Sequence, residues 1–153
     1  MANIKLLSSY LKGEDETRYV AILEDNTIWW FAPGYPWQPS SMDGLPENCV
    51  IENFIAYSKD DGTRYVIILG DNTLWWFAPG YPWQPSSMDG LPKEKKIIQL
   101  TAYNKTDGTR YVVVLEDNTI WWFAPGYPWQ PSSSDGLPKA DVVVVDDAPK
   151  TDA

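Results

Sequence analysis

Apolar residues come in short consecutive runs separated by polar turns, and this pattern predicts β-strands rather than helices. The runs at 111–115 and 120–123 are apolar at every position, and the polar triplet 117–119 lies between them. Runs of β-branched and aromatic residues on either side of a short polar turn are typical of a β-hairpin. Because no stretch has a sustained helical period, we expect an all-β chain with essentially no α-helix.

This pattern occurs three times along the chain. The segment that starts at Trp29 recurs at Trp75 and at Trp121, 46 residues further on each time. A period of this length indicates a propeller, a solenoid or a threefold-symmetric β fold. We therefore expect a single domain, residues 1–140, built from the repeats 1–48, 49–94 and 95–140, followed by an acidic tail, residues 141–153, with a possible strand at 142–145.

The third repeat serves to predict the elements of each copy. Its loop is rich in Pro, Gly and Ser, which favours an ordered irregular connection over a regular element. The predicted order is a strand at 96–103, a polar turn at 104–109, strands at 111–115 and 119–124, and a loop at 125–138 with a short irregular strand near Trp129.

Consecutive apolar positions carry information about the fold, since successive side chains of a strand point to opposite faces of the sheet. Both faces of this hairpin must then be covered. A blade of a β-propeller, placed between two neighbouring blades, meets this requirement, and we favour it. A β-trefoil monomer, which would bury mainly one face of each hairpin, is the alternative.

Three blades do not close a ring, since propellers have about 4–8 blades. We expect two chains to form a six-bladed homodimer, because an open stack would leave unpaired sheet edges. Residues 137–145 resemble residues 91–98, which begin the third repeat. The predicted tail strand at 142–145 would therefore complete a blade in its own chain or in a partner, and both alternatives stay open.

The hairpin half of each repeat also resembles a known class of propeller. In the third repeat, an apolar strand at 97–102 is followed by a second apolar strand, the short polar turn 117–119 and a strand that carries Trp121 and Trp122. This order resembles a blade of RCC1-type or tachylectin-type propellers, which implies the propeller fold. The Pro-Gly-Tyr-Pro-Trp-Gln-Pro loop, residues 33–39, is not part of the RCC1 pattern, so exchange-factor activity is not implied.

Charge and composition exclude several classes of partner. The 153 residues carry a formal net charge of −9, so a phosphate backbone or an anionic membrane surface would be repelled. We expect no nucleic acid partner and no membrane insertion. Cys49 is the single cysteine, which leaves no intrachain disulfide framework. The chain starts without the apolar segment of a signal peptide, so we expect a cytoplasmic protein, with leaderless export also possible.

The sequence favours binding over catalysis. It contains no histidine, which removes the usual general base and the commonest metal ligand. An active site is a single asymmetric constellation, whereas every candidate acid here occurs three times. We therefore expect no enzymatic activity, no cofactor and no metal site.

The loop that follows the tryptophan strand varies less than the strands around it. Residues 29–46 are identical to residues 75–92, and the third copy differs only by Ser134, which replaces Met42 and Met88. Loops ordinarily vary more than the elements they join. The constancy indicates either a repeated binding site, or recent duplication of a loop that is locked as packing between blades.

Carbohydrate is the ligand that best suits these loop residues. Trp and Tyr rings stack on the C–H face of a sugar, Gln, Asp and Ser bind its hydroxyl groups, and the prolines pre-order the loop. Three weak sites on one body would gain about 10²–10⁴ in apparent affinity for a multivalent surface. The hypothesis is a multivalent lectin whose partners are glycans, with sites formed by Tyr35, Trp37, Gln38, Ser40 and Asp43, by Tyr81, Trp83, Gln84, Ser86 and Asp89, and by Tyr127, Trp129, Gln130, Ser132 and Asp135.

Two other functions remain open. In one, the same aromatic loops dock an extended peptide and the chain is a protein-interaction scaffold. In the other, the chain is an engineered or purely structural repeat without a selected ligand. The arginines before the second strands, Arg18, Arg64 and Arg110, are interpreted as structural, each pairing with a nearby acid or stacking on an aromatic ring.

Overall fold

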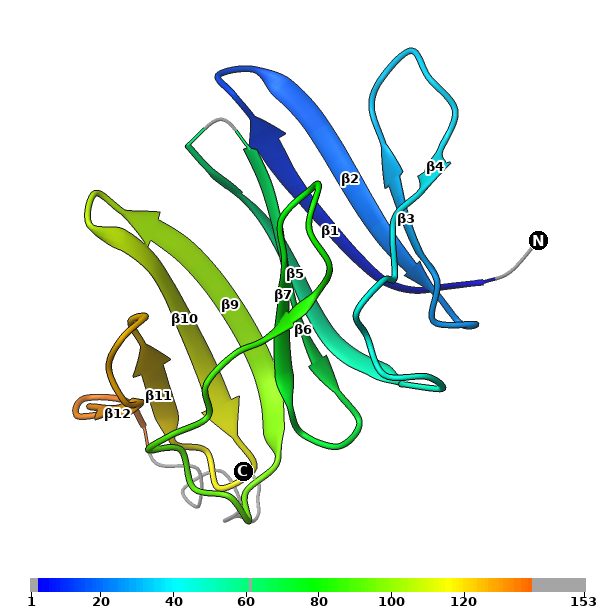
Figure 1. Cartoon of the computed structure of the whole chain (residues 1–153). Helices are drawn as coiled ribbons and strands as arrows, with labels where there is room; N and C mark the ends of the chain where they lie inside the picture. The colour runs from blue at the N-terminus through cyan, green and yellow to red at the C-terminus, as the bar shows by residue number, and fades with distance from the viewer. Residues whose placement is uncertain (1–2, 61, 139–153) are drawn as a thin grey trace, which may run out of the picture.

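The computed structural model describes residues 3–60 and 62–138, which form β-strands and the turns between them. The strands make three four-stranded antiparallel sheets, one for each repeat (Figure 1). Sheet 1 contains β1 (Ile4–Lys12), β2 (Glu16–Leu23), β3 (Ile28–Phe31) and β4 (Gln38–Pro39), sheet 2 contains β5 (Ile51–Lys59), β6 (Gly62–Leu69), β7 (Leu74–Phe77) and β8 (Gln84–Pro85), and sheet 3 contains β9 (Ile97–Lys105), β10 (Gly108–Leu115), β11 (Ile120–Phe123) and β12 (Gln130–Ser132).

The prediction of an all-β chain of three repeats is confirmed, and so are the four strands of each repeat. The predicted turn at 104–109 is shorter than expected, because β9 and β10 continue to pair as far as Lys105 and Gly108. Thr109 Oγ1 donates a hydrogen bond to Asn104 Oδ1 at 3.0 Å, and polar side chains thus extend the ladder into solvent. The predicted tail strand at 142–145 lies outside the described residues.

An Asp-Asn-Thr triplet forms the turn between the second and third strands of each sheet. Asn26 has a φ of 66°, a left-handed conformation that asparagine tolerates better than most residues. The amide of Thr27 donates to Asp25 Oδ1 at 3.0 Å, and Trp29 Nε1 donates to Thr27 Oγ1 at 3.0 Å. The triplet therefore turns the chain and also orients the first tryptophan of each pair, as equivalent bonds do at Trp75 and Trp121.

The three sheets lie side by side in chain order, with β1, β5 and β9 as neighbours (Figure 1). We call the face of a sheet that carries Trp37, Trp83 or Trp129 its front face, and the face that carries Trp30, Trp76 or Trp122 its back face. The front faces of sheets 2 and 3 pack on the back faces of sheets 1 and 2.

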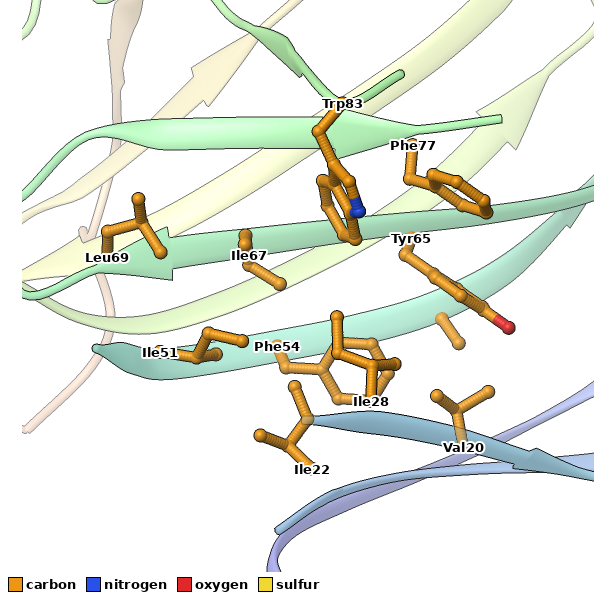
Figure 2. Close-up of a cluster of buried hydrophobic side chains, with 11 residues drawn as sticks. Val20, Ile22, Ile28, Ile51, Phe54, Tyr65, Ile67, Leu69, Phe77 and Trp83 are labelled. Carbon is orange, nitrogen blue, oxygen red and sulfur yellow. The ribbon is translucent and has the colours of Figure 1, made fainter. Parts of the chain in front are cut away.

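The two junctions between sheets hold the hydrophobic core. At the first junction Val20, Ile22 and Ile28 on the back of sheet 1 pack against the front of sheet 2 (Figure 2). Equivalent positions fill the second junction. The front-face residues in the two junctions are Ile51, Phe54, Tyr65, Ile67, Leu69, Phe77 and Trp83 in sheet 2, and Ile97, Tyr111, Val113, Leu115, Phe123 and Trp129 in sheet 3.

Sheet 2 is covered on both faces, as the consecutive apolar runs predicted. Every residue from Tyr65 to Leu69 is buried. The outer sheets differ, because each has a neighbour on one side only. Tyr19 on the front of sheet 1 is 41% exposed, whereas the equivalent Tyr65 is 3% exposed. Within residues 3–60 and 62–138, no other sheet covers the front of sheet 1 or the back of sheet 3, and we call these the two bare faces.

Truncation of a junction tryptophan tests this assignment of the core. Trp83→Ala should lower the free energy of unfolding by about 3–5 kcal/mol, because it opens a cavity in the first junction. Tyr81→Ala, two residues away at an exposed position, should change it by less than about 0.5 kcal/mol. Urea denaturation followed by circular dichroism measures both values, and equal losses in the two variants would contradict the assignment.

Candidate functional site

A cleft of about 350 Å³ lies at the junction between sheets 2 and 3. Trp76 on the back of sheet 2 forms part of its wall, together with residues of β8 and with the Pro-Gly turn that follows β11. Both sheets are needed to form it. The lining residues are Tyr57, Lys59, Arg64, Trp76, Pro85, Ser86 and Ser87 from the second repeat, and Thr109, Tyr111, Phe123, Pro125 and Gly126 from the third.

The first junction carries the same residue types at all of these positions. Sheet 1 supplies a Tyr, a Lys, an Arg, a Trp, a Pro and two Ser residues, and sheet 2 supplies the Thr, Tyr, Phe, Pro and Gly. Most of these positions lie in stretches that are the same in both repeats, but Tyr10 and Lys12 match Tyr57 and Lys59 within first strands that otherwise differ. The equivalent residues are Tyr10, Lys12, Arg18, Trp30, Pro39, Ser40 and Ser41, with Thr63, Tyr65, Phe77, Pro79 and Gly80.

The cleft combines an aromatic wall with hydrogen-bonding groups. Trp76 is partly buried, so part of its indole faces the cleft. The guanidinium of Arg64 stands nearby, and its Nη1 donates to the carbonyl oxygen of Thr63 at 2.9 Å. Ser86 and Ser87, which directly follow β8, add hydroxyl groups to the lining. An aromatic plane beside fixed donors and acceptors can hold a polar ring compound by stacking and by hydrogen bonds.

The three arginines share one arrangement. Arg18 and Arg110 each donate to the carbonyl oxygen of the preceding threonine, as Arg64 does. Arg18 also pairs with Glu16 at 2.9 Å, and Arg110 pairs with Asp107 at 3.0 Å. The predicted pairing with a nearby acid is confirmed for these two residues. The backbone contact fixes the base of the guanidinium at the mouth of each junction.

A chain of tyrosine and threonine hydroxyl groups closes the floor of each junction. Tyr10 and Thr63 share a hydrogen bond of 2.6 Å between their hydroxyl oxygens, and Tyr65 interacts with Tyr10 and Ser40. At the second junction, burial raises the pKa of Tyr111 far above its usual value, and the neighbouring Tyr57 raises it further. Burial likewise raises the pKa of Tyr10, Tyr57 and Tyr65, so these phenols stay neutral in the folded protein.

The structure separates the residues that the sequence grouped into loop pockets. The tyrosines are the most exposed, at 67–69% in all three repeats, because each follows the Pro-Gly pair of a tight turn. The glutamines and aspartates are exposed, whereas Ser40 and Ser86 are partly buried and Ser132 is exposed. The predicted residues with exposed side chains are Tyr35, Trp37, Gln38, Asp43, Tyr81, Gln84, Asp89, Tyr127, Gln130, Ser132 and Asp135.

The prediction that Trp83 and Trp129 present a face to a ligand is wrong. Both are 2% exposed, and their backbone amides donate to the carbonyl oxygens of Asp43 and Asp89 in the preceding repeat, at 2.8 Å in each case. The loop tryptophan thus packs on the aspartate loop of the previous sheet. Packing between neighbouring sheets, the other explanation of the constant loop, accounts for these two residues, while no described sheet covers Trp37, which is 39% exposed.

Sequence reasoning missed most of the cleft. Of the residues in its wall, Ser86 was named as a ligand-binding candidate, whereas Trp76, Tyr57 and Lys59 were not. The usable signal was agreement between repeats at positions outside the constant loop. Tyr10 and Lys12 match Tyr57 and Lys59, although the strands that carry them are otherwise dissimilar.

Within residues 3–60 and 62–138, no group of three or more Cys, Asp or Glu side chains is placed to hold a metal ion. No helix in this part of the chain is long and apolar enough to cross a membrane.

These features define an all-β protein of three repeated sheets with a cleft at the junction between sheets 2 and 3. No described family matches the sequence, and neither does any curated protein. Among solved structures, the chain is similar to the BP39L lectin from Burkholderia pseudomallei, with a TM-score of 0.52 and 15% sequence identity. The match covers 86% of this chain and 42% of that one, so this chain spans less than half of that lectin. At this identity the likeness shows the fold alone.

Alkaline pH tests the buried tyrosines. Their folded pKa values are raised, so their contribution to stability is present below the unfolded value of about 10 and is lost as pH rises further. Each such group should lower the free energy of unfolding by up to about 1.4 kcal/mol for each pH unit above that value. Urea unfolding of the native chain and of Tyr111→Phe between about pH 8 and pH 11 measures the slope. The variant should show the shallower decline, and identical slopes would contradict the role of Tyr111.

Proposed function

We propose that this protein is a multivalent carbohydrate-binding protein, a lectin, and that its sugar sites are the clefts at the junctions between sheets. The observation that supports this most is that the second junction has a cleft and the first carries the same lining residues. A wall of Trp, Arg, Lys and two Ser residues has the chemistry of a site for polar rings. Selection for packing alone would not require the same Lys and Arg at the rim of both junctions.

The aromatic side chains Trp30 and Trp76 would stack on the apolar face of the sugar, and Ser40 and Ser86 would bind its hydroxyl groups. The guanidinium groups of Arg18 and Arg64 would donate further hydrogen bonds. The exposed tyrosines at the loop tips, Tyr35, Tyr81 and Tyr127, would extend the contact surface beside each cleft. The proposal includes no catalysis and no cofactor.

Repetition suits a lectin because sites on one rigid body bind a multivalent glycan surface together. Apparent affinity would rise by about 10²–10⁴ over that of a single cleft when the spacing of the glycans matches. The similarity to the BP39L lectin is consistent with this function through the shared fold, and the proposal rests on the cleft.

A glycan array probed with the fluorescently labelled chain tests the proposal. We expect binding that is released by free monosaccharide, and calorimetry with the released sugar then counts the sites. Trp76→Leu should remove one site per chain, because leucine keeps the apolar packing but lacks the aromatic face. Trp75→Leu is the matched control, since Trp75 is its neighbour on the same strand but faces the first junction core.

The control should bind with unchanged stoichiometry, and thermal unfolding should show both variants folded. Binding that resists excess monosaccharide and persists in Trp76→Leu would contradict the lectin proposal. It would favour a scaffold that docks peptides on the exposed tyrosines.

A further inference from the structure

Among the described residues, no other sheet covers the front face of sheet 1 or the back face of sheet 3. The two internal junctions cover the front faces of sheets 2 and 3 and the back faces of sheets 1 and 2. Most positions of the two bare faces carry the residue types that are buried at the internal junctions, so each bare face can be compared with them position by position.

The front face of sheet 1 is an open apolar hollow. Ile4 is 59% exposed, whereas its equivalents Ile51 and Ile97 are at most 1% exposed. Trp37 is 39% exposed, against 2% for Trp83 and Trp129. A hollow of about 620 Å³ lies here and is lined by Asn3, Ile4, Ala21, Leu23, Asp25, Trp29 and Trp37.

On the back face of sheet 3, residues are exposed whose equivalents in the second sheet are buried against a neighbour. Leu137 is 60% exposed, whereas the equivalent Leu91 is 5% exposed in the second junction. A Cβ atom added to Gly44 or Gly90 would lie 2.7 Å from the carbonyl oxygen of the following repeat's loop tryptophan, but one added to Gly136 would meet nothing within 4 Å. The loop of sheet 3 thus has the shape that receives a tryptophan segment, with no such segment in its own chain among the described residues.

Hydrogen-bonding groups on the two bare faces also match those that pair across the internal junctions. Asn26 Oδ1 accepts a hydrogen bond from the amide of Ile51 at 2.9 Å, and Asn72 Oδ1 accepts one from Ile97 at 2.8 Å. The third asparagine, Asn118, occupies the equivalent turn with the same φ of 69° as Asn72. The equivalent amide for it to bind is that of Ile4, at the far end of the chain.

We propose that the front face of sheet 1 docks on the back face of sheet 3 of a second copy of this chain, and that two copies close a six-bladed ring. We choose a second copy as the partner because it would make the same contacts that the sheets make at the two internal junctions. Trp37 would donate from its backbone amide to the carbonyl oxygen of Asp135 in the second copy, and its indole Nε1 would donate to the carbonyl oxygen of Ser133. Asn118 of the second copy would accept from the amide of Ile4.

Two copies are the number that closes. Head-to-tail contacts form a ring when the rotation between sheets closes and a filament when it does not. Six sheets lie within the range of about 4–8 blades that propellers use, whereas three copies would give nine. The same assembly would bury both bare apolar faces of each copy, because the front face of one copy packs on the back face of the other.

The closing junction would also complete a third cleft. Sheet 3 supplies Trp122, Arg110, Lys105 and Ser132 at the positions that line the internal clefts, and the second copy supplies Tyr19. The remaining positions match in type as well, namely Tyr103, Pro131 and Ser133 on one side and Thr17, Phe31, Pro33 and Gly34 on the other. Each ring would then hold six clefts. Assembly itself needs no ligand, so its test is independent of sugar binding.

The junction between the two copies would contain fewer large apolar side chains than the two junctions within the chain. Ala21 replaces Ile67 and Val113 on the front face, and Ser134 replaces the methionines that pack in the internal junctions. We therefore expect the ring to dissociate on dilution before the sheets unfold.

Light scattering of the full chain on a size-exclusion column, over a dilution series, measures the assembly. The expected mass at the concentrated end is twice 17.4 kDa. Gly136→Ala should shift the mass to that of the single chain, because the new Cβ would occupy the space needed by the Trp37 segment. Gly126→Ala is the matched control, with a φ of 92° against 94° and equally open surroundings, and it should remain dimeric.

Mixing two variants distinguishes head-to-tail contact from a face-to-face dimer. Trp37→Ala and Gly136→Ala should each be monomeric alone, but their mixture should regain a dimer through the one junction in which both faces are intact. A native chain that is monomeric at every concentration would overturn the proposal and leave the faces to another occupant, such as the C-terminal residues. A Gly136→Ala chain that stays dimeric would overturn it too.

Discussion

Packing of the front face of one sheet on the back face of the sheet before it is the interaction on which this structure depends. A single four-stranded sheet from one repeat has apolar residues on both faces and cannot bury either alone. Sheet 2, with neighbours on both sides, has Tyr65–Leu69 entirely buried, while the outer sheets keep Tyr19 and Trp122 exposed. The stability of the folded chain therefore depends on the sum of the contributions of its junctions, as in other repeat proteins.

The loop that follows each tryptophan strand makes this packing specific. Its aspartate carbonyl accepts from the tryptophan of the next repeat, and its glycine leaves room for the approaching backbone. The asparagine of the turn reaches the first strand of the next sheet in the same way. Each repeat thus carries both halves of a junction, and among the described residues sheets 1 and 3 each have one half that no other sheet covers.

The fold was largely predictable from the sequence, whereas the site was not. Consecutive apolar runs at 65–69 and 111–115 could be satisfied only by sheets covered on both faces, and the Asp-Asn-Thr triplets placed the hairpin turns. The loop residues were misassigned at Trp83 and Trp129, because a residue's position within its own loop does not reveal contact with a loop 46 residues earlier. Trp76 and Arg64 lie on separate strands and meet the serines that follow β8 only through the sheet pairing, which is tertiary information.

Junctions also link the fold to the proposed function. The cleft lies where sheets 2 and 3 meet, so any change that loosens this junction should weaken the proposed binding site and the core together. A chain with three sheets has two such places, and a closed ring of two chains would have six. Valency, and with it affinity for a glycan surface, would then depend on assembly rather than on the affinity of any single cleft.

Solvent accessibility of Trp37 tests the central claim most directly. Hydroxyl-radical footprinting with mass spectrometry can separate Trp37, Trp83 and Trp129, because the peptides around them have different flanking sequences. If every front face packs on a back face in solution, Trp37 should be protected as strongly as Trp83 and Trp129 in concentrated samples and should become reactive on dilution. Reaction of Trp37 at the rate of an exposed tryptophan at all concentrations would contradict the account.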